Sequence, residues 1–196
     1  MNFAIQKQAR SAADLRARLT PDLSPLYRRI LTWDFFHDQD FPPGSSAKDY
    51  MMVANTFRNV GEYKSTFEPL LMLECWNQFR KAKEENNFTV FSLELATRMN
   101  ADNFVELHMT MDQVDFVAQK VSVMESDVLL VSTAANNPLL SSSEPSCLAR
   151  VVGITKKRNI VEMSVRCLPS PSMLPALKVK AKYRVAKILS YVNPLN

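Results

Sequence analysis

Basic side chains recur at a regular spacing near the end of the sequence, and their chemistry would be the binding of phosphate groups. In residues 177–189, cations alternate with apolar or aromatic residues. Successive side chains of an extended strand point to opposite faces, so this spacing predicts a strand with one cationic face. The candidate nucleic-acid contacts in this row are Lys178, Lys180, Lys182 and Arg184. A plain solvent-facing side of a sheet has the same pattern, and both interpretations stay open.

A second group of cations, Lys156, Lys157 and Arg158, lies between two segments with strand-like patterns. We expect these residues at the tip of a β-hairpin, where they would contact phosphates without reading base sequence. Residues 141–196 carry a net charge of +8, whereas residues 31–140 carry −8. A basic surface attracts polyanions, although acidic and basic parts of one fold also neutralise each other.

Catalytic and metal-binding motifs are absent from the sequence. Its three glycines, Gly44, Gly61 and Gly153, form neither G-x-x-x-x-G-K-[ST] nor G-x-G-x-x-G. The two histidines and three cysteines have no spacing typical of a zinc site. We therefore expect no catalytic residue, no metal and no cofactor in this chain, and we expect its cysteines to be small buried hydrophobes.

The composition is that of a soluble globular protein. The 196 residues are 46% hydrophobic and 22% charged, which suits one domain with an appendage. No apolar run approaches the roughly 18–20 residues of a membrane helix, and the first residues lack the apolar core of a secretory signal. These features predict a cytosolic or nuclear protein.

The first half of the chain has the pattern of helices. We expect helices over residues 3–19, 24–33 and 65–86, the last beginning at a capping box formed by Ser65 and Glu68. The first half of this long helix is apolar on nearly all sides, which predicts burial against several neighbours. Little else in the chain remains to cover it, so we expect a packing partner outside the chain. The candidates for that contact are Phe67, Leu70, Leu71, Trp76 and Phe79.

After Asn86 the pattern changes to the two-residue period of β-strands. Residues 126–133 form a short continuous apolar run, which is expected of a strand covered on both faces. About six such segments follow one another at even spacing, which favours a small antiparallel β-barrel and an α+β fold overall. In the last segment the alternation breaks at Ala186, which indicates either a β-bulge or the end of the strand.

Four stretches resemble a known family when they are taken in order. They are TFEPLLMLECW (66–76), VMESDVLLVST (123–133), CLARVVGITKK (147–157) and KYRVAKILS (182–190). From about Leu26 to Ser190 the chain resembles the senataxin-like helicases, superfamily 1B enzymes related to the nonsense-mediated-decay helicase. By this resemblance, residues 1–60 are a brace-like segment, 61–87 a stalk helix, 88–190 the β-barrel and 191–196 a truncated tail.

The resemblance implies a non-catalytic accessory region of an ATP-dependent RNA/DNA helicase, which braces the motor and helps to position single-stranded nucleic acid. The implied partners are the motor domains in cis, single-stranded RNA or DNA, and the transcription machinery. ATP and magnesium would belong to the parent helicase, which would act in the nucleus in transcription termination and R-loop resolution. The sequence contains no Walker motif, so we expect a fragment of a longer protein. The alternative is a stand-alone β-barrel adaptor for protein partners, without helicase activity.

Overall fold

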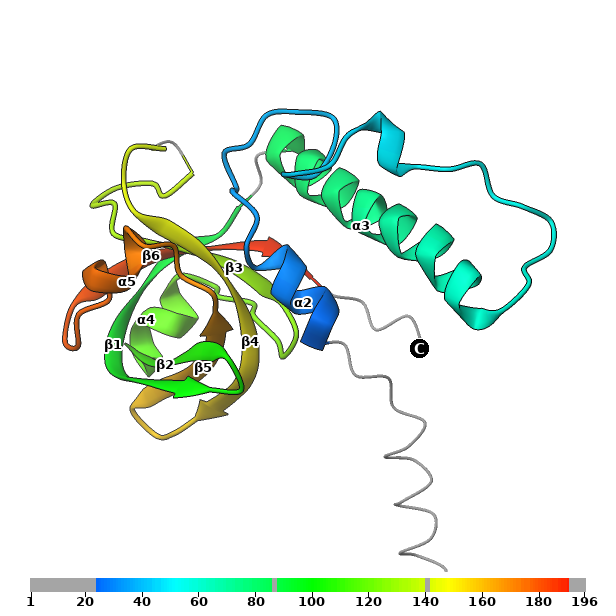
Figure 1. Ribbon diagram of the computed structural model, residues 1–196. Coiled ribbons are helices and arrows are strands. Elements are labelled where there is room, and N and C mark those ends of the chain that lie inside the picture. The colour runs from blue at the N-terminus through cyan, green and yellow to red at the C-terminus, as the bar shows by residue number, and fades with distance from the viewer. Residues whose placement is uncertain (1–23, 86–87, 140–141, 191–196) are drawn as a thin grey trace, which may run out of the picture.

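The computed structural model describes residues 24–85, 88–139 and 142–190, so the helix expected over residues 3–19 lies outside the described residues. A helical first half precedes a closed barrel of six antiparallel strands, which confirms the predicted α+β fold (Figure 1). The helical elements are α2 (Ser24–Ile30), the 3-10 turn η1 (Ala47–Asp49), α3 (Val60–Glu85), α4 (Gln113–Ala118) and α5 (Met173–Ala176).

The barrel has the strand order β1-β2-β5-β4-β3-β6, and β6 closes it by pairing with β1. Asp102 and Asn103 both adopt a positive φ and form the two-residue turn between β1 and β2, as the twist of a tight hairpin requires. The strands are β1 (Val90–Ala101), β2 (Phe104–Asp112), β3 (Val128–Ser132), β4 (Ser146–Lys156), β5 (Ile160–Cys167) and β6 (Lys182–Leu189).

The barrel interior is filled by the alternate residues that the two-residue period places on one face. On β5, for example, Val161, Met163, Val165 and Cys167 are all buried in this interior, as predicted. The short elements α4 and α5 extend the same core, with Phe116 and Met173 among its buried side chains. Each fully buried apolar side chain of this size contributes about 1.5–3 kcal/mol, so this core holds the strands in register.

Two neighbouring strands are covered on both faces. The residues of β3 are all buried, as its continuous apolar run predicts, with Leu129 inside the barrel and Leu130 in a second cluster outside it. On β6, Val185 points into the barrel while Ala186 and Ile188 belong to the outer cluster. The β3–β6 register skips one residue of β6 near its end, so the predicted β-bulge is confirmed.

The outer cluster joins α2 and α3 to the outside of the barrel. Trp33, which follows α2, packs against α3, with its ring centroid 5.5 Å from that of Trp76 and 5.6 Å from that of Phe79. Phe35 is buried in the same cluster, so the segment that follows α2 packs against α3 and the outside of the barrel. In Figure 1, α3 runs away from the barrel, so that its N-terminal half lies farther from the strands than its C-terminal half.

The long helix begins earlier than predicted. Val60 is its first residue, and the Asn59 side-chain oxygen accepts a hydrogen bond of 2.9 Å from the Glu62 N–H. The Ser65 hydroxyl instead donates to the Glu62 carbonyl within the helix. The predicted capping box at Ser65 and Glu68 is therefore wrong, because the Asn59 side chain already caps the helix more than one turn earlier.

Candidate nucleic-acid interface

The alternating cations do not share one strand face. Lys178 and Lys180 lie in the turn between α5 and β6, whereas Lys182 and Arg184 lie on β6 itself. Lys180 adopts φ of 64°, a conformation found in turns, and its N–H donates to the Leu95 carbonyl at 2.7 Å. The predicted strand over residues 178–184 is therefore wrong in its first half. Val179, predicted to point inward, is 49% exposed.

A buried phenol explains why the chain turns here. The Tyr183 hydroxyl accepts a hydrogen bond of 2.6 Å from the Lys178 N–H and donates to the Ala176 carbonyl at 2.8 Å. The Arg98 guanidinium donates to the Leu174 and Leu177 carbonyls, each at 2.9 Å. These side chains satisfy backbone groups of the turn, and the backbone hydrogen bonds of Lys180 and Ala181 with Leu95 attach the turn to β1.

Three of the four cations in the row are free to meet a ligand. The lysines Lys178, Lys180 and Lys182 are exposed and form no ion pair or side-chain hydrogen bond within the described residues. Arg184 differs, because its guanidinium donates to the Ser92 hydroxyl at 2.9 Å and to the Ala135 carbonyl at 3.2 Å. It links β1 to the segment after β3, which is a structural role.

The second cationic group lies at the tip of the β4–β5 hairpin, as predicted. The Lys156 ammonium lies 4.9 Å from the centroid of the Phe116 ring, and the Lys157 ammonium lies 2.6 Å from the Glu162 carboxylate. Arg158 is exposed and has no side-chain partner in the described part of the chain. An exposed ion pair contributes about 0–1 kcal/mol, so separating Lys157 from Glu162 costs little.

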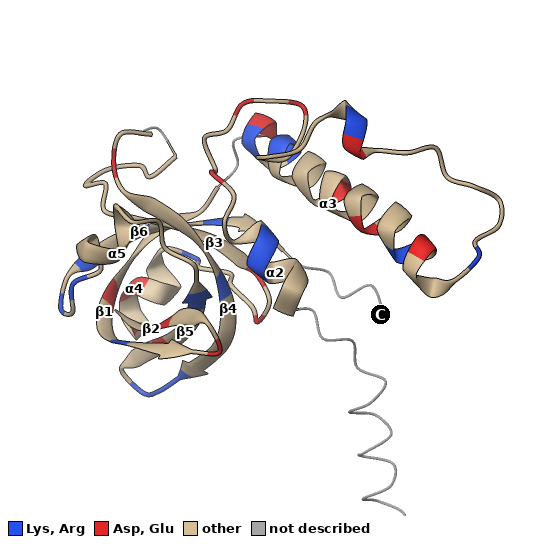
Figure 2. Ribbon diagram, in the orientation of Figure 1, with Lys and Arg blue, Asp and Glu red and all other residues tan. Residues whose placement is uncertain are grey.

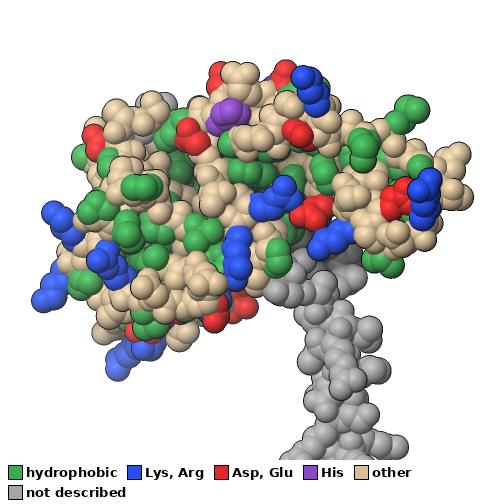
Figure 3. Space-filling view, viewed as in Figure 1, with side chains coloured by type: hydrophobic (Ala, Val, Ile, Leu, Met, Phe, Trp, Pro, Cys, Tyr) green, Lys and Arg blue, Asp and Glu red, His purple; other side chains and the backbone are tan. Residues whose placement is uncertain are grey.

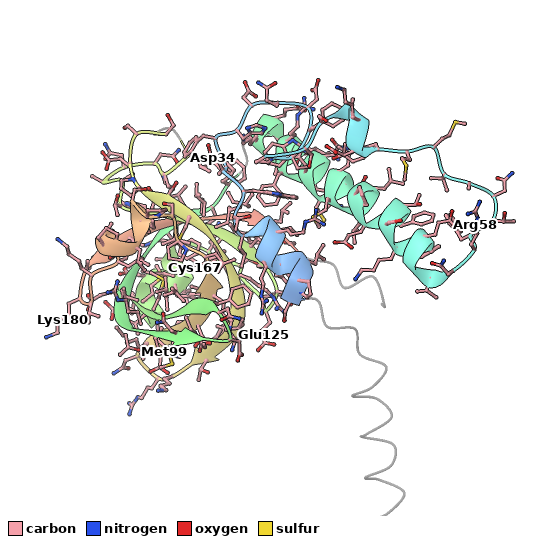
Figure 4. All side chains as sticks on the ribbon, viewed as in Figure 1. Asp34, Arg58, Met99, Glu125, Cys167 and Lys180 are labelled. Atoms are coloured by element: carbon pink, nitrogen blue, oxygen red, sulfur yellow. The ribbon has the colours of Figure 1, made fainter. Side chains whose placement is uncertain are left out.

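Both cationic groups lie on the side of the barrel that is remote from α3. Figure 2 shows Lys and Arg at the turn before β6 and at the β4–β5 hairpin, and the space-filling view shows basic side chains projecting along the same edge (Figure 3). Lys180, labelled in Figure 4, points outward from this edge. We call Lys156, Lys157, Arg158, Lys178, Lys180 and Lys182 the cationic edge.

The long helix divides into an enclosed part and an exposed part. Trp76 and Phe79 have 0% exposure, and the Trp76 indole N–H donates to the Gln39 carbonyl at 3.0 Å. These two residues cannot contact an outside partner, so their prediction as motor-packing residues is wrong. The physical reason is that Trp33 and Phe35 of the brace-like segment already cover them.

The remaining helix candidates lie nearer the N-terminal end of α3. Phe67 and Leu70 are half-buried, and Leu71 is 48% exposed. Around them lie large apolar side chains that sequence analysis missed, although the run Met51-Met52-Val53 was a visible signal. We call this set the apolar helix end; it comprises the exposed Met51, Met52, Val53, Val60, Tyr63 and Leu71.

The cysteines of the chain are free thiols, and two of the three are buried. Burial and a hydrogen bond between the thiols of Cys147 and Cys167 raise the pKa of Cys147 well above its usual value, with the hydrogen bond as the larger cause. That thiol is uncharged at neutral pH. Cys75 is only half-buried, so the expectation of burial holds for two of the three cysteines. Within residues 24–85, 88–139 and 142–190, no cluster of three or more His, Cys, Asp or Glu side chains is arranged to hold a metal ion.

No helix in the described ranges has the length and apolar character needed to cross a membrane.

The fold is that of a closed antiparallel β-barrel module with helices on its outside. Residues 86–188 match the family model of the Helicase SEN1 beta-barrel domain, so the chain belongs to this family. The chain is similar to Helicase sen1 of Schizosaccharomyces pombe, with 27% identity over 170 residues. It is also similar to Helicase SEN1 of Saccharomyces cerevisiae, with 25% identity over 185 residues.

These relatives are much longer proteins. The first match covers 86% of this chain and 10% of the relative, and the second covers 89% of this chain and 8% of the relative. The matched region therefore spans about a tenth of the length of these relatives. The resemblance to senataxin-like helicases stated from the sequence is confirmed at the level of this family.

Proposed function

We propose that this chain is a non-catalytic accessory region of a Sen1-like helicase, which braces the motor domains and helps to hold single-stranded RNA or DNA. The observation that carries the proposal is a separation on the molecule. Exposed cations lie along one edge of the barrel. At the opposite end, the six exposed side chains of the apolar helix end lie on α3 and the segment before it, whereas the other exposed large apolar side chains are spread over the barrel, with Val179 among the cations. These two surfaces have the chemistry of two different partners.

The bracing role rests on how α2 joins α3 to the barrel. The Arg29 guanidinium lies 2.6 Å from the Glu68 carboxylate of α3. On the barrel side, Arg28 lies 5.5 Å from the centroid of the Phe104 ring and Arg150 lies 3.9 Å from that of Tyr27. Together with the buried outer cluster, these contacts make the helices and the barrel one unit. A partner bound at the apolar helix end therefore fixes the orientation of the barrel.

The partner that we assign to the apolar helix end is the motor domain of the same polypeptide. Large apolar side chains such as Met52, which is 96% exposed, are unusual in water and are typical of a surface that another protein covers. Phe67 contributes through a ring cluster, with its centroid 4.5 Å from that of Tyr63 and 5.8 Å from that of Phe57. This cluster of mutually inclined rings forms an apolar surface on the projecting half of α3.

The cationic edge is the proposed contact for the nucleic-acid backbone. Lysine and arginine contacts to phosphate position a strand and carry no sequence information, which suits a helicase that moves along any sequence. ATP and magnesium would act in the motor domains. The nucleus as location, the transcription machinery as partner, and transcription termination and R-loop resolution as processes are further parts of this proposal, and they rest on the family resemblance alone.

The proposal is tested by the affinity of the chain for a fluorescently labelled single-stranded RNA, measured by anisotropy at several salt concentrations. We expect the variant Lys178→Glu/Lys180→Glu/Lys182→Glu to bind more weakly. Its salt dependence should also be flatter, by about 0.7 in the log–log slope for each phosphate that the variant no longer neutralises.

A matched control changes three exposed lysines on the helical side, as Lys48→Glu/Lys64→Glu/Lys81→Glu. This control alters the net charge equally and should change the affinity less. If both triple variants lost the same affinity for RNA, the binding would depend on the net charge of the chain and not on the cationic edge. A wild-type chain that binds no RNA would favour the stand-alone adaptor.

A further inference from the structure

A polar groove lies on the outer face of strands β2, β5 and β4, and neither surface described above uses it. Its volume is about 280 Å³. The residues that line the groove form two rows, because paired residues of β2, β5 and β4 lie side by side. One row is His108, Ser164 and Gly153, and the other is Thr110, Glu162 and Thr155.

The groove contains hydrogen-bonding groups that have no partner. The hydroxyls of Thr110 and Thr155 form no hydrogen bond within the described residues. Ser164 and His108 are paired with each other, at 2.9 Å between the hydroxyl and Nδ1. The Glu162 carboxylate uses Oε1 for Lys157, which leaves Oε2 as an acceptor. The groove therefore offers both donors and acceptors to a ligand.

The groove is open because small residues and irregular pairing leave space there. A Cβ atom placed on Gly153 would meet no atom within 4 Å, and the backbone of Gly153 is not in the left-handed region. The backbone thus does not require glycine at this position, and what the glycine provides is room. Register shifts occur beside it on β4 and across the groove at Ala96 on β1. Such bulges redirect side chains and often adjoin functional sites.

The groove adjoins one part of the cationic edge. Thr155 directly precedes Lys156, and Glu162 is the ion-pair partner of Lys157. A strand whose phosphate meets the hairpin cations would therefore place an adjacent sugar at the groove. No Phe, Tyr or Trp side chain lines the groove, so hydrogen bonds rather than base stacking would hold the ligand.

We propose that this groove is a ribose subsite, which binds the 2′-hydroxyl of one nucleotide and so selects RNA over DNA. The 2′-hydroxyl donates and accepts hydrogen bonds, and it is the group by which a protein distinguishes RNA from DNA. In the groove it donates to Glu162 and accepts from a threonine hydroxyl, whereas a deoxyribose leaves these groups without a ligand partner. This inference rests on the proposed function, because the hairpin cations must first hold the strand.

The test compares the affinities of the 196-residue chain for RNA and DNA single strands of identical length and base sequence, with uracil in place of thymine in the DNA, by fluorescence anisotropy. We expect the wild type to bind the RNA about five- to tenfold more tightly, as the loss of one or two net hydrogen bonds implies. The variant Thr110→Val/Thr155→Val keeps the shape of the groove but lacks both hydroxyls. Its preference for RNA should fall severalfold, because the threonine hydroxyls no longer donate while Glu162 still accepts, and its affinity for DNA should be unchanged.

A second variant, Gly153→Val, fills the groove without meeting a neighbouring atom at Cβ, and it should lower the ratio in the same way. Melting curves of both variants confirm that they fold. A wild-type ratio of one, or a ratio unchanged in the Thr110→Val/Thr155→Val variant, would overturn the ribose subsite and leave the proposed function intact. A wild type that binds neither strand would overturn both.

Discussion

The two halves of α3 have similar apolar composition but opposite surroundings. Met72 at the middle of the helix, and Trp76 and Phe79 in its C-terminal half, are buried against the brace-like segment and the outside of the barrel. In the N-terminal half, Val60, Tyr63 and Leu71 are exposed. The comparison teaches that apolar composition alone does not identify an interface. The same kind of side chain stabilises this chain in one half and is available to a partner in the other.

The largest expected effect is that of Trp76→Ala in the enclosed half. Trp76 is fully buried, contacts Trp33 and Phe79 through its ring, and donates a hydrogen bond to Gln39. Removing it leaves a large cavity, so we expect the free energy of unfolding to fall by about 3–5 kcal/mol. Chemical denaturation followed by circular dichroism measures this change. A loss below about 1 kcal/mol would mean that the enclosed half does not stabilise the fold.

The adjacent residues Leu71 and Met72 of α3 contrast an exposed position with a buried one. We expect Leu71→Asp to change the free energy of unfolding by at most about 1 kcal/mol, because Leu71 is half exposed and only helix propensity is reduced. This corrects the expectation, from the sequence alone, of a helix buried on all sides. The control Met72→Asp places a charge in the outer cluster and should unfold the chain or lower its melting temperature strongly. Similar melting curves for the two variants would contradict the division of α3.

The smallest expected effect concerns Lys83, near the C-terminal end of α3. Desolvation by burial lowers the pKa of its ammonium group, which donates to the His37 carbonyl at 3.0 Å and lies 5.0 Å from the centroid of the Phe35 ring. The unfolded chain then binds more protons than the folded chain just below pH 10.5, so this group makes stability rise with pH in that window. We expect the difference in unfolding free energy between wild type and Lys83→Met to change in that direction as the pH rises toward 10.5. A pH-independent difference would show that the ammonium is fully solvated.

Much of the barrel could be predicted from the sequence because apolar and polar residues alternate along most of its strands. The inward face of β5 and the double coverage of β3 follow from local pattern, since a strand has only two faces. The turn at Lys178–Lys180 could not be predicted in this way. Tyr183 and Arg98 stabilise it through hydrogen bonds to backbone groups, and Arg98 is remote in sequence.

The candidate sites show the same limit. The hairpin tip at residues 156–158 is local, and the sequence located it. The groove beside it depends on three strands in register, and no spacing along the chain brings His108, Ser164 and Gly153 together.

The sequence by itself determined the α+β class, the six-stranded barrel and the absence of nucleotide-binding motifs, because these depend on residue types and local periodicity. It indicated the helicase family through its resemblance to known proteins. Tertiary structure alone decided which half of the long helix is covered and which lysines are unpaired. It also decided where the polar groove lies. Burial and ion pairing depend on residues that are distant in sequence and meet only when the chain is folded.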